Sequence, residues 1–582
     1  MTIHEREDLR EQVRSLFYHG FNGYMDHAFP EDELQPLTCT GRGKDKSDAT
    51  NLGINDVCGD YALTLIDSLD MLPLLGDQTA FELGVRNVIE SVTFDVDSKV
   101  QIFEVTIRVM GGLLSAHQYA SLPELNSTID WYQGELLNLA KDLGNRLLPA
   151  FDSPTGIPFP RINLRHGMQT HTPPDTTETC AAGAGSLVLE FALLSELTGE
   201  PRFQAAAVKA FREVWNRRLD LDLVGNTLDA DSGNWMSSYT GIGAGVDSFY
   251  EYALKSWVFL DEHYFYDVWN KSYTSIQRHI VDDDGFLYRN VHVRTGFQIT
   301  NYIDSLSAFY SGLLVLAGKV EEAIKSHLIY QSLWTRYRGL PERFNYHSLQ
   351  VEMPWYPLRP EFIESTYYLY RATKDPFYLA VGKQVVYDLL ELRQKCGFAV
   401  VSNVVSRTFD NRMESFVLSE TLKYLYLLFD ESHPLNVLHS NWIFSTEGHP
   451  FFRPANRSSR YKMSTDFSVQ ESVFTESCEI PSGPGFYSAV MSRDDIDLSQ
   501  FKVGLARLGS NLPDYFPPAN VTGTCRPIRI RTDFEVLFGT VASSVLNASA
   551  SIVQIGKELM IKSLLGFGAN PMHRDDLLKE IG

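Results

Sequence analysis

A motif that returns at nearly even spacing constrains the fold of this chain more than any other feature. An acidic residue, usually followed by Ser or Thr and then by a long apolar stretch, occurs seven times. The last five copies lie 57, 57, 60 and 56 residues apart, whereas the first two intervals are 37 and 86 residues. The acids are Asp67, Glu104, Glu190, Asp247, Asp304, Glu364 and Glu420. A period near 57 residues has room for two helices and their loops, which indicates a helical repeat.

The apolar residues after each acid have helical spacing. In the Asp304 copy, Leu306, Phe309, Tyr310 and Leu313 follow the i, i+3, i+4, i+7 pattern of one helix face. Seven helical hairpins with a shared inner-helix motif predict a mainly α fold, a closed toroid of paired helices. An open solenoid is the alternative, but it needs polar capping repeats, and the sequence shows none. If every acid begins an inner helix, the seven carboxylates meet at one end of the ring.

The helical period fades after about residue 454. The polar stretch RPANRSSRYK follows, and β-like runs such as FYSAVMS and DFEVLFGTVASSVL occur beyond it. We therefore predict two domains: residues 1–454 form the toroid, and residues 455–582 form a smaller C-terminal module with β content. The sequence leaves the role of this module open, with partner or client binding as one candidate.

The charge balance excludes some classes of partner. Asp and Glu number 73 against 51 Lys and Arg, which gives a net charge of −22. A surface this acidic argues against binding of nucleic acid or of an anionic membrane. No apolar run approaches the roughly 18–20 residues that cross a bilayer, so no transmembrane segment is predicted. The charged start, MTIHEREDLREQVRSLF, is typical of an amphipathic helix and not of a signal peptide, which leaves a cytosolic protein or a mature form without its leader.

Six cysteines and five glycosylation sequons bear on the compartment. The cysteines include no CxxC pair, so a zinc or thioredoxin-like motif is not indicated. Cys478 and Cys525 both lie in the C-terminal module and could form a disulfide there. The sequons favour a protein of the secretory pathway. They are Asn126, Asn270, Asn456, Asn520 and Asn547.

A pocket rich in carboxylates, without a Ser–His–Asp, Cys–His or phosphate-loop signature, favours glycoside hydrolysis. That reaction needs one protonated carboxylic acid and one carboxylate on the other face of the sugar. Glu104 lies in the apolar run VQIFEVTIRVMGG, where burial is expected to raise its pKa and suit it to the acid role. Glu361 follows Pro360 at a predicted helix start beside Arg359, and both features favour the ionised form that a base needs. Taken alone, acids in a first turn also fit an ordinary helix cap.

Five segments of the chain carry a resemblance to a known family, both in their residues and in their order: FEVTIRVMGGLLSA, VDSFYEYALKSW, LRPEFIESTYYLYRATKDP, RMESFVLSETLKYLYLLFD and FSTEGHP. They resemble glycoside hydrolase family 47, the class I α-1,2-mannosidases, from about Val13 to Pro450. FYHGFNGYMDHAFPEDELQPLTC and YIDSLSAFYSGLLVLAG are similar to the EDEM-type branch, the ER degradation-enhancing α-mannosidase-like proteins. The resemblance implies an (α/α)7 barrel, in agreement with the toroid.

The resemblance also implies catalytic roles. Glu104 would be the general acid, acting through a water. Asp247 would be a second acid, to which the role of proton donor is sometimes given. Glu361 would be the base that activates the attacking water in an inverting mechanism, with acid and base roughly 6.5–9.5 Å apart.

Further residues would shape the pocket and hold a cation. Pocket carboxylates by the same resemblance are Glu342, Glu364, Glu420 and Glu447. Arg108 and Arg359 would contact the sugar or hold carboxylates in place, and Phe416 would lie under the sugar ring. Thr446 would bind Ca²⁺ through its carbonyl and hydroxyl oxygens, and the ion would also bind two hydroxyls of the mannose.

Two positions depart from the ER-mannosidase branch, and one cysteine pair matches the EDEM-type branch. Gly245 stands where that branch has Arg, and Ser305 stands where it has His. Both changes open space around the leaving sugar, so the mannose that is removed stays undetermined. Cys39 and Cys396 match a disulfide of EDEM-type proteins that ties the N-terminal region to the last helical units. Two buried free thiols are the alternative.

The leading expectation is therefore an inverting, Ca²⁺-dependent α-1,2-mannosidase of the endoplasmic reticulum lumen. It would trim high-mannose N-glycans on misfolded glycoproteins and so mark them for degradation, with a protein disulfide isomerase-type oxidoreductase as partner. A mannose-binding lectin or degradation receptor with little turnover is the second hypothesis. An unrelated helical toroid such as a terpene cyclase would carry a DDxxD metal motif, and the sequence has none.

Overall fold

The computed structural model describes residues 1–168, 176–436 and 442–453. The predicted C-terminal module therefore lies outside the described residues and stays a prediction. The same holds for the Cys478–Cys525 pairing and for the sequons at Asn456, Asn520 and Asn547.

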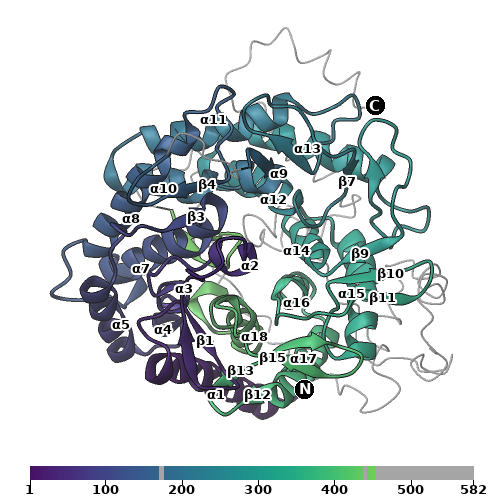
Figure 1. Ribbon diagram of the computed structural model, residues 1–582. Helices are drawn as coiled ribbons and strands as arrows, with labels where there is room; N and C mark the ends of the chain where they lie inside the picture. The colour runs from purple at the N-terminus through teal and green to yellow at the C-terminus, as the bar shows by residue number, and fades with distance from the viewer. Residues whose placement is uncertain (169–175, 437–441, 454–582) are drawn as a thin grey trace, which may run out of the picture.

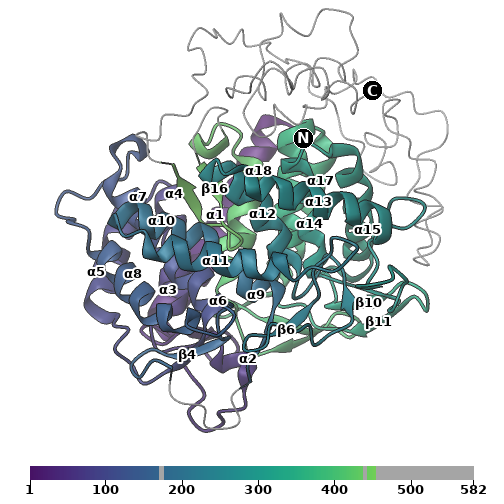
Figure 2. The same ribbon diagram turned by 90° about the horizontal axis from the view of Figure 1, so that it is seen from above.

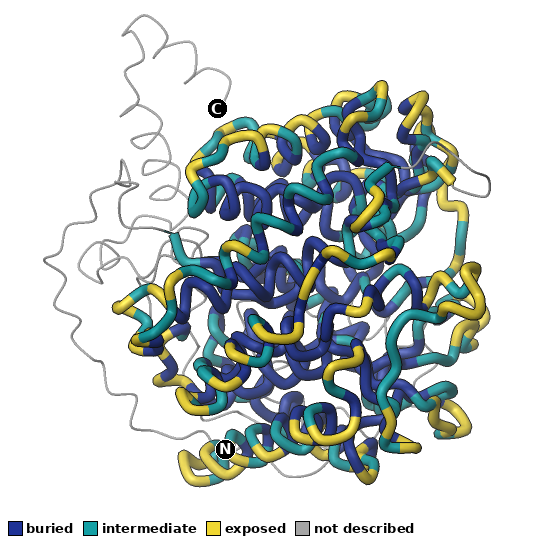
Figure 3. Tube along the Cα trace, turned by 60° about the vertical axis from the view of Figure 1, so that its left-hand side comes forward, coloured by how far each residue is buried: buried dark blue, intermediate teal, exposed yellow. Residues whose placement is uncertain are grey.

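An inner ring of helices surrounds the axis of the molecule (Figure 1). In the described residues its members are α3 (Leu63–Ser68), α7 (Gly111–Ser121), α10 (Val188–Thr198), α12 (Asp247–Leu260), α14 (Phe309–Leu316), α16 (Glu361–Thr373) and α18 (Leu422–Phe429). These helices are apolar on nearly every side; in α10, for example, every residue from Val188 to Ser195 is buried. The burial-coloured trace shows the same dark interior within a partly exposed shell (Figure 3).

A second ring of helices covers the first from outside (Figure 1). It consists of α1 (Ile3–His27), α5 (Gln78–Ser91), α8 (Glu135–Leu147), α11 (Arg202–Asn216), α13 (His263–His279), α15 (Val320–Tyr337) and α17 (Pro376–Glu391). Helix α11 buries one face, with Phe203, Ala207 and Phe211 in the core and Arg202 and Gln204 outside it, whereas α15 is buried on all sides over residues 326–334. The first helix, α1, packs against the last, α18, and so closes the ring. The (α/α)7 barrel predicted from the repeat is confirmed.

Short strands gather at one end of the barrel, where Figure 2 shows β4 (Arg161–Asn163), β6 (Thr227–Asp229), β10 (Arg343–Asn345) and β11 (Gln350–Met353). They lie in the connections from an outer helix to the next inner one and form small antiparallel sheets, often with a strand of a neighbouring connection, as β10 does with β9 (Tyr302–Asp304). The predicted β-like segment 398–410 is such a hairpin, made by β14 (Val400–Asn403) and β15 (Thr408–Asp410).

One further hairpin closes the described part of the chain. Strands β16 (Trp442–Phe444) and β17 (Pro450–Phe452) pair antiparallel, and the turn Ser445–His449 joins them. β16 contacts α12 and β17 contacts α7, so the hairpin lies inside the inner ring. It therefore carries Thr446 and Glu447 toward the interior of the barrel.

One stretch of the described chain, Ala181–Thr198, is long and apolar enough to cross a membrane. It consists of α9 (Ala181–Gly185) followed by α10, and 78% of it is buried inside the molecule. Glu190 lies within it and is fully buried. These properties identify the stretch as part of the barrel core.

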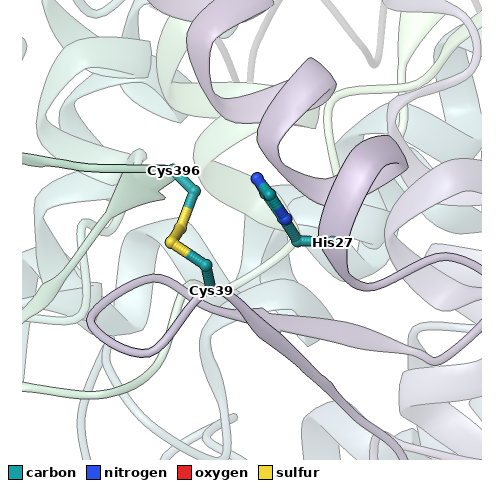
Figure 4. A group of neighbouring side chains, drawn as sticks. All are labelled: His27, Cys39 and Cys396. Atoms are coloured by element: carbon teal, nitrogen blue, oxygen red, sulfur yellow. A yellow bond between two sulfur atoms is a disulfide. The ribbon is translucent and has the colours of Figure 1, made fainter.

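The predicted Cys39–Cys396 disulfide is present and joins residues 357 positions apart. His27, the last residue of α1, lies beside the bond (Figure 4). In the described chain, these three side chains are the group of ligand atoms near enough to one another to hold a metal ion. Both sulfur atoms are bonded to each other, so we assign the group to the disulfide and not to a metal site.

Removing this disulfide should destabilise the barrel, because it closes a very long loop and restricts the unfolded chain. For the double variant Cys39→Ser/Cys396→Ser we expect a loss of about 2–5 kcal/mol, measured as a lower midpoint of thermal unfolding. Cys180→Ser is the control, since Cys180 is unpaired and a hydroxyl keeps its bond to the amide of Gly183. An unchanged midpoint in the double variant would contradict the prediction.

Candidate active site at the ends of the inner helices

The repeat acids lie at or near the starts of the inner helices, with local differences. Asp247 is the first residue of α12, Glu190 the third of α10 and Glu364 the fourth of α16. Asp304 instead ends strand β9 (Tyr302–Asp304), and Asp67 is the fifth residue of α3.

Two acids adjoin π-helical turns, which occur often at functional sites. Glu104 precedes the turn Val105–Met110, and Glu420 lies within the turn Val417–Thr421.

Electrostatic repulsion acts between several of these acids. Asp304 and Glu361 raise the pKa of Asp247, and Asp67 and Glu364 raise the pKa of Glu420. In the same way, Glu104 and Asp67 raise the pKa of Glu447, and Glu251 raises the pKa of Glu190. The carboxylates of all seven repeats therefore belong to one connected group.

A glycine brings Asp247 and Asp304 together. A side chain at Gly243 would lie 2.2 Å from Oδ2 of Asp304, so only glycine lets the loop before α12 pass this close. The amide of Asp247 donates to the carbonyl of Gly243 over 3.0 Å, which starts the helix beside that contact. Burial raises the pKa of Asp247 to about 8, and Asp304, Glu251 and Glu361 act in the same direction. Asp247 is therefore predominantly protonated at neutral pH.

Glu361 and Arg359 flank Pro360 at the start of α16. Nε of Arg359 donates to Oε1 of Glu342 over 2.5 Å. Arg359 lowers the pKa of Glu361, as expected, but burial outweighs it and raises that pKa to about 7, with Glu342 and Asp304 adding to the rise. The prediction that the helix start and Arg359 favour the ionised form overall is therefore wrong, because it omitted desolvation.

Glu104 and Arg108 form an ion pair one helical turn apart, with Nε of Arg108 2.9 Å from Oε2 of Glu104. The side chain of Glu104 remains 22% exposed, whereas Ile102 and Val105 turn into the core. The expectation that Glu104 is enclosed by its apolar neighbours is therefore wrong. Its partner is a guanidinium on the same helix face.

Phe416 lies between two arginines. The Arg108 and Arg359 guanidinium carbons stand 5.2 and 5.9 Å from the centre of the ring. Arg108 also donates to the hydroxyl of Ser415 over 3.3 Å and lies 3.7 Å from Oε1 of Glu447. The structure thus places the predicted aromatic next to both predicted basic residues.

Three buried carboxyl groups, those of Glu364, Glu420 and Glu447, have raised pKa values. Burial, followed by mutual repulsion, raises the pKa of Glu420 well above its usual range, and burial raises that of Glu447 to about 8. The pKa of Glu364 is also raised well above its usual range by burial, with Lys255 opposing the shift. A bound cation would relieve this repulsion.

The oxygen donors fit Ca²⁺, which binds six to eight oxygens. Thr446 is partly exposed between the buried Ser445 and Glu447, and Oε1 of Glu447 has no hydrogen-bond partner in the described residues. In the described residues, no three carboxylate groups have oxygens close enough to one another to hold a metal ion by themselves. Thr446 would therefore supply direct ligands, while water and sugar hydroxyls complete the shell.

The repeat pattern left two groups of site residues undetected. Lys255 pairs with Glu251 on α12, and both are buried. The buried His449 lies 2.8 Å from Asp70 and 3.3 Å from Asp67. The pKa of His449 rises to about 9 because the two aspartates outweigh the cost of burial. A Lys four residues after Glu251 was visible in VDSFYEYALKSW, but the contact of His449 with Asp67 and Asp70 was not.

Both departures from the ER-mannosidase branch lie in tight surroundings. Gly245 has φ +88°, and a Cβ there would meet the amide group of Asn226 at 2.7 Å, so the local chain favours glycine. Ser305 donates to Oε1 of Glu342 over 3.3 Å, beside the Arg359 contact. Neither observation identifies the mannose that is removed.

The two described sequons are accessible. Asn126 is exposed in a turn, and Asn270 is exposed on α13. Whether either carries a glycan stays a prediction.

Comparison with known proteins agrees with this geometry. The model of glycosyl hydrolase family 47 matches residues 16–453. The chain is 46% identical over 561 residues to "ER degradation-enhancing alpha-mannosidase-like protein 1" of Schizosaccharomyces pombe, covering 96% of this chain and 70% of that protein. It is 41% identical to the protein of the same name from Saccharomyces cerevisiae, covering 82% of this chain and 63% of that one.

An Arabidopsis thaliana relative, "Alpha-mannosidase I MNS5", is 44% identical over 452 residues, or 77% of each chain. The solved α-1,2-mannosidase of Trichoderma reesei has the same fold, with a TM-score of 0.69 at 24% identity, covering 77% of this chain and 99% of that one. The family model spans the barrel from the second half of α1 onward and includes every carboxylate described above. The chain belongs to glycosyl hydrolase family 47 and is similar, within it, to the ER degradation-enhancing α-mannosidase-like proteins.

Proposed function

We propose that this chain is an inverting, Ca²⁺-dependent α-1,2-mannosidase that trims high-mannose N-glycans on misfolded glycoproteins and marks them for ER-associated degradation. The observation that carries the proposal is the split among the carboxylates of one site. Burial and the acidic neighbours Asp304 and Glu251 raise the pKa of Asp247 and favour its protonated form, while Arg359 beside Glu361 opposes the effect of burial there and favours the ionised form. An inverting glycosidase needs one group of each kind.

In this mechanism Glu361 removes a proton from a water, which attacks the anomeric carbon of the terminal mannose. The leaving oxygen takes a proton from the opposite side of the sugar. The contrast between protonated Asp247 and ion-paired Glu104 supports Asp247 as the direct donor, with Glu104 acting through a water. Arg359 and Glu342 hold each other in place beside the base, and Phe416 provides an apolar surface for the ring.

The excess of buried negative charge supports Ca²⁺ as the cofactor. Thr446 would bind the ion, which would orient hydroxyls of the mannose. Glu364, Glu420 and Glu447 would balance its charge, and a bound cation would favour their ionised forms against the burial that raises their pKa values.

The Cys39–Cys396 disulfide and the names of the fungal relatives support a lumenal location in the endoplasmic reticulum, because structural disulfides persist in oxidising compartments. A disulfide isomerase-type oxidoreductase is part of the proposal as a partner.

The test is to incubate the full chain with a high-mannose glycoprotein, with and without a protein disulfide isomerase, and to follow glycan mass. We expect successive loss of hexose, and no loss from a glycan lacking terminal α-1,2-linked mannose. Binding to the glycan without hexose loss under either condition would contradict the enzyme and favour the lectin hypothesis.

Replacing Arg359 should change the pH dependence in a defined direction. The base must be ionised, so kcat/KM should fall as the pH drops through the pKa of Glu361, near 7. Arg359 lowers that pKa, and its loss also frees Glu342 to repel Glu361. In Arg359→Gln the acidic limb of the pH profile should therefore move to higher pH. Arg371→Gln, on the last turn of the same helix, is the control, and equal limbs in the two variants would contradict the assignment.

A further inference from the structure

A directed chain of hydrogen bonds reaches Thr446 from the barrel wall. The amide of Thr446 donates to the hydroxyl oxygen of Tyr252 over 3.2 Å, and that hydroxyl donates to Oε1 of Glu190 over 2.5 Å. A backbone N–H can only donate, so the tyrosine oxygen must accept there and its single proton goes to Glu190. Tyr252 and Glu190 are both 0% exposed and lie on the inner helices α12 and α10.

The peptide unit before Thr446 is held at both of its ends from one helix. Its carbonyl, that of Ser445, accepts from Nζ of Lys255 over 3.3 Å, while its N–H is held by Tyr252. Tyr252 and Lys255 are three residues apart on α12 and so share a face. Lys255 is held in turn by Glu251.

Other contacts hold the far side of the same turn. Nζ of Lys423 donates to the carbonyl of Gly448 over 2.7 Å, and His449 lies 2.8 Å from Asp70. These contacts anchor residues 448 and 449, and the amide of Gly448 adds a bond to the Ser445 carbonyl over 3.3 Å, whereas the N–H of Thr446 is held by Tyr252 of α12. The hydroxyl and carbonyl groups of Thr446 extend from the backbone that this contact holds in place.

We propose that Glu190 and Tyr252 are positioning residues for the cation site: Glu190 orients the hydroxyl of Tyr252, which holds the backbone N–H of Thr446 and so keeps the residue whose oxygens would bind the cation in place. The inference rests on the proposed function, because it takes Thr446 as the Ca²⁺ ligand. The inference gives the repeat acid Glu190 a structural role through its oxygen Oε1. Its other oxygen, Oε2, has no hydrogen-bond partner in the described residues.

The experiment measures Ca²⁺ affinity of the full chain by calorimetry. Tyr252→Phe should weaken binding about 10–100-fold, as is typical when a partner behind a metal ligand is removed. Glu190→Leu should have a similar effect, whereas Glu190→Gln keeps an accepting oxygen and should stay within about threefold of the unchanged chain. The matched control is Tyr310→Phe, since Tyr310 is also fully buried on an inner helix and its hydroxyl has no partner in the described chain.

The melting temperature in chelator separates positioning from folding: Tyr252→Phe and Tyr310→Phe should agree there and differ only when Ca²⁺ is added. Activity of Tyr252→Phe should recover toward that of the unchanged chain at high Ca²⁺. Equal Ca²⁺ affinity in Tyr252→Phe and Tyr310→Phe would overturn the inference, as would equal weakening by Glu190→Gln and Glu190→Leu. Failure of the unchanged chain to bind Ca²⁺ would instead overturn the proposed cation site together with this inference.

Discussion

Glu361→Gln is expected to lower kcat for mannose release by about 10²–10⁴-fold, the usual contribution of a general base. Glutamine has nearly the same shape and can still accept hydrogen bonds, but it cannot take a proton from water. The substrate should therefore bind almost as well, and KM should change much less than kcat. Released mannose and residual glycan mass, followed over time on a high-mannose glycoprotein, provide the measurement.

The matched control is Glu321→Gln, which makes the same change in the first turn of α15 in the outer ring. Glu321 is exposed, and its nearest partner is Lys325, 3.5 Å away. This variant should keep full activity. Retention of more than about a tenth of the activity in Glu361→Gln would contradict the assignment of the base.

Removing Ca²⁺ with a chelator should abolish mannose release and lower the melting temperature. The buried group of Glu364, Glu420 and Glu447 would then lose the cation that balances it, and the sugar would lose its anchor. A ligand at 100 times its dissociation constant stabilises a fold by about 2.7 kcal/mol, so the shift should be measurable. Adding back Ca²⁺ should restore both properties.

Mg²⁺ should restore them poorly, because it demands a smaller octahedral shell and gives up its water reluctantly. Thr446→Val removes a ligand oxygen while keeping the shape of the side chain, so this variant should need more Ca²⁺ for the same activity. Full activity in a preparation shown by metal analysis to lack Ca²⁺ would contradict the cofactor assignment.

The ring of helices could be predicted because the repeated pattern that produces it is visible in the sequence. Each inner helix needs an apolar sequence all round, and each begins near an acid, so the period of 56–60 residues between Glu190 and Glu420 is visible without the structure. The irregular interval of 86 residues also has a physical reason. Between Glu104 and Glu190 the chain contains, besides α7 and α8, the strands β4 and β5 (Glu178–Cys180) and the helix α9.

The charge states of the site could not be predicted in the same way. A helix start and a neighbouring arginine are local features, and they favour an ionised Glu361. Desolvation depends on what the rest of the barrel places around the side chain, and it raises the pKa to about 7 instead. The surroundings of Glu104 also depend on the fold, since its apolar neighbours in sequence turn into the core while it pairs with Arg108.

The contacts of the β16–β17 turn could not be predicted from the sequence, for a related reason. Tyr252, Asp70 and Lys423 come from parts of the chain far apart in sequence, and they meet Ser445–His449 only once the ring has closed. The motif FSTEGHP indicated Thr446 and Glu447 as site residues but not the side chains that hold them.

The stereochemistry of the released sugar tests the central claim most directly. Proton NMR of the first product formed from a high-mannose glycoprotein should show β-mannose, because water activated by Glu361 attacks the face opposite the leaving group. The signal should be absent with Glu361→Gln and present with Glu321→Gln. First appearance of α-mannose, or no mannose at all from the Ca²⁺-loaded chain with its oxidoreductase present, would contradict the account.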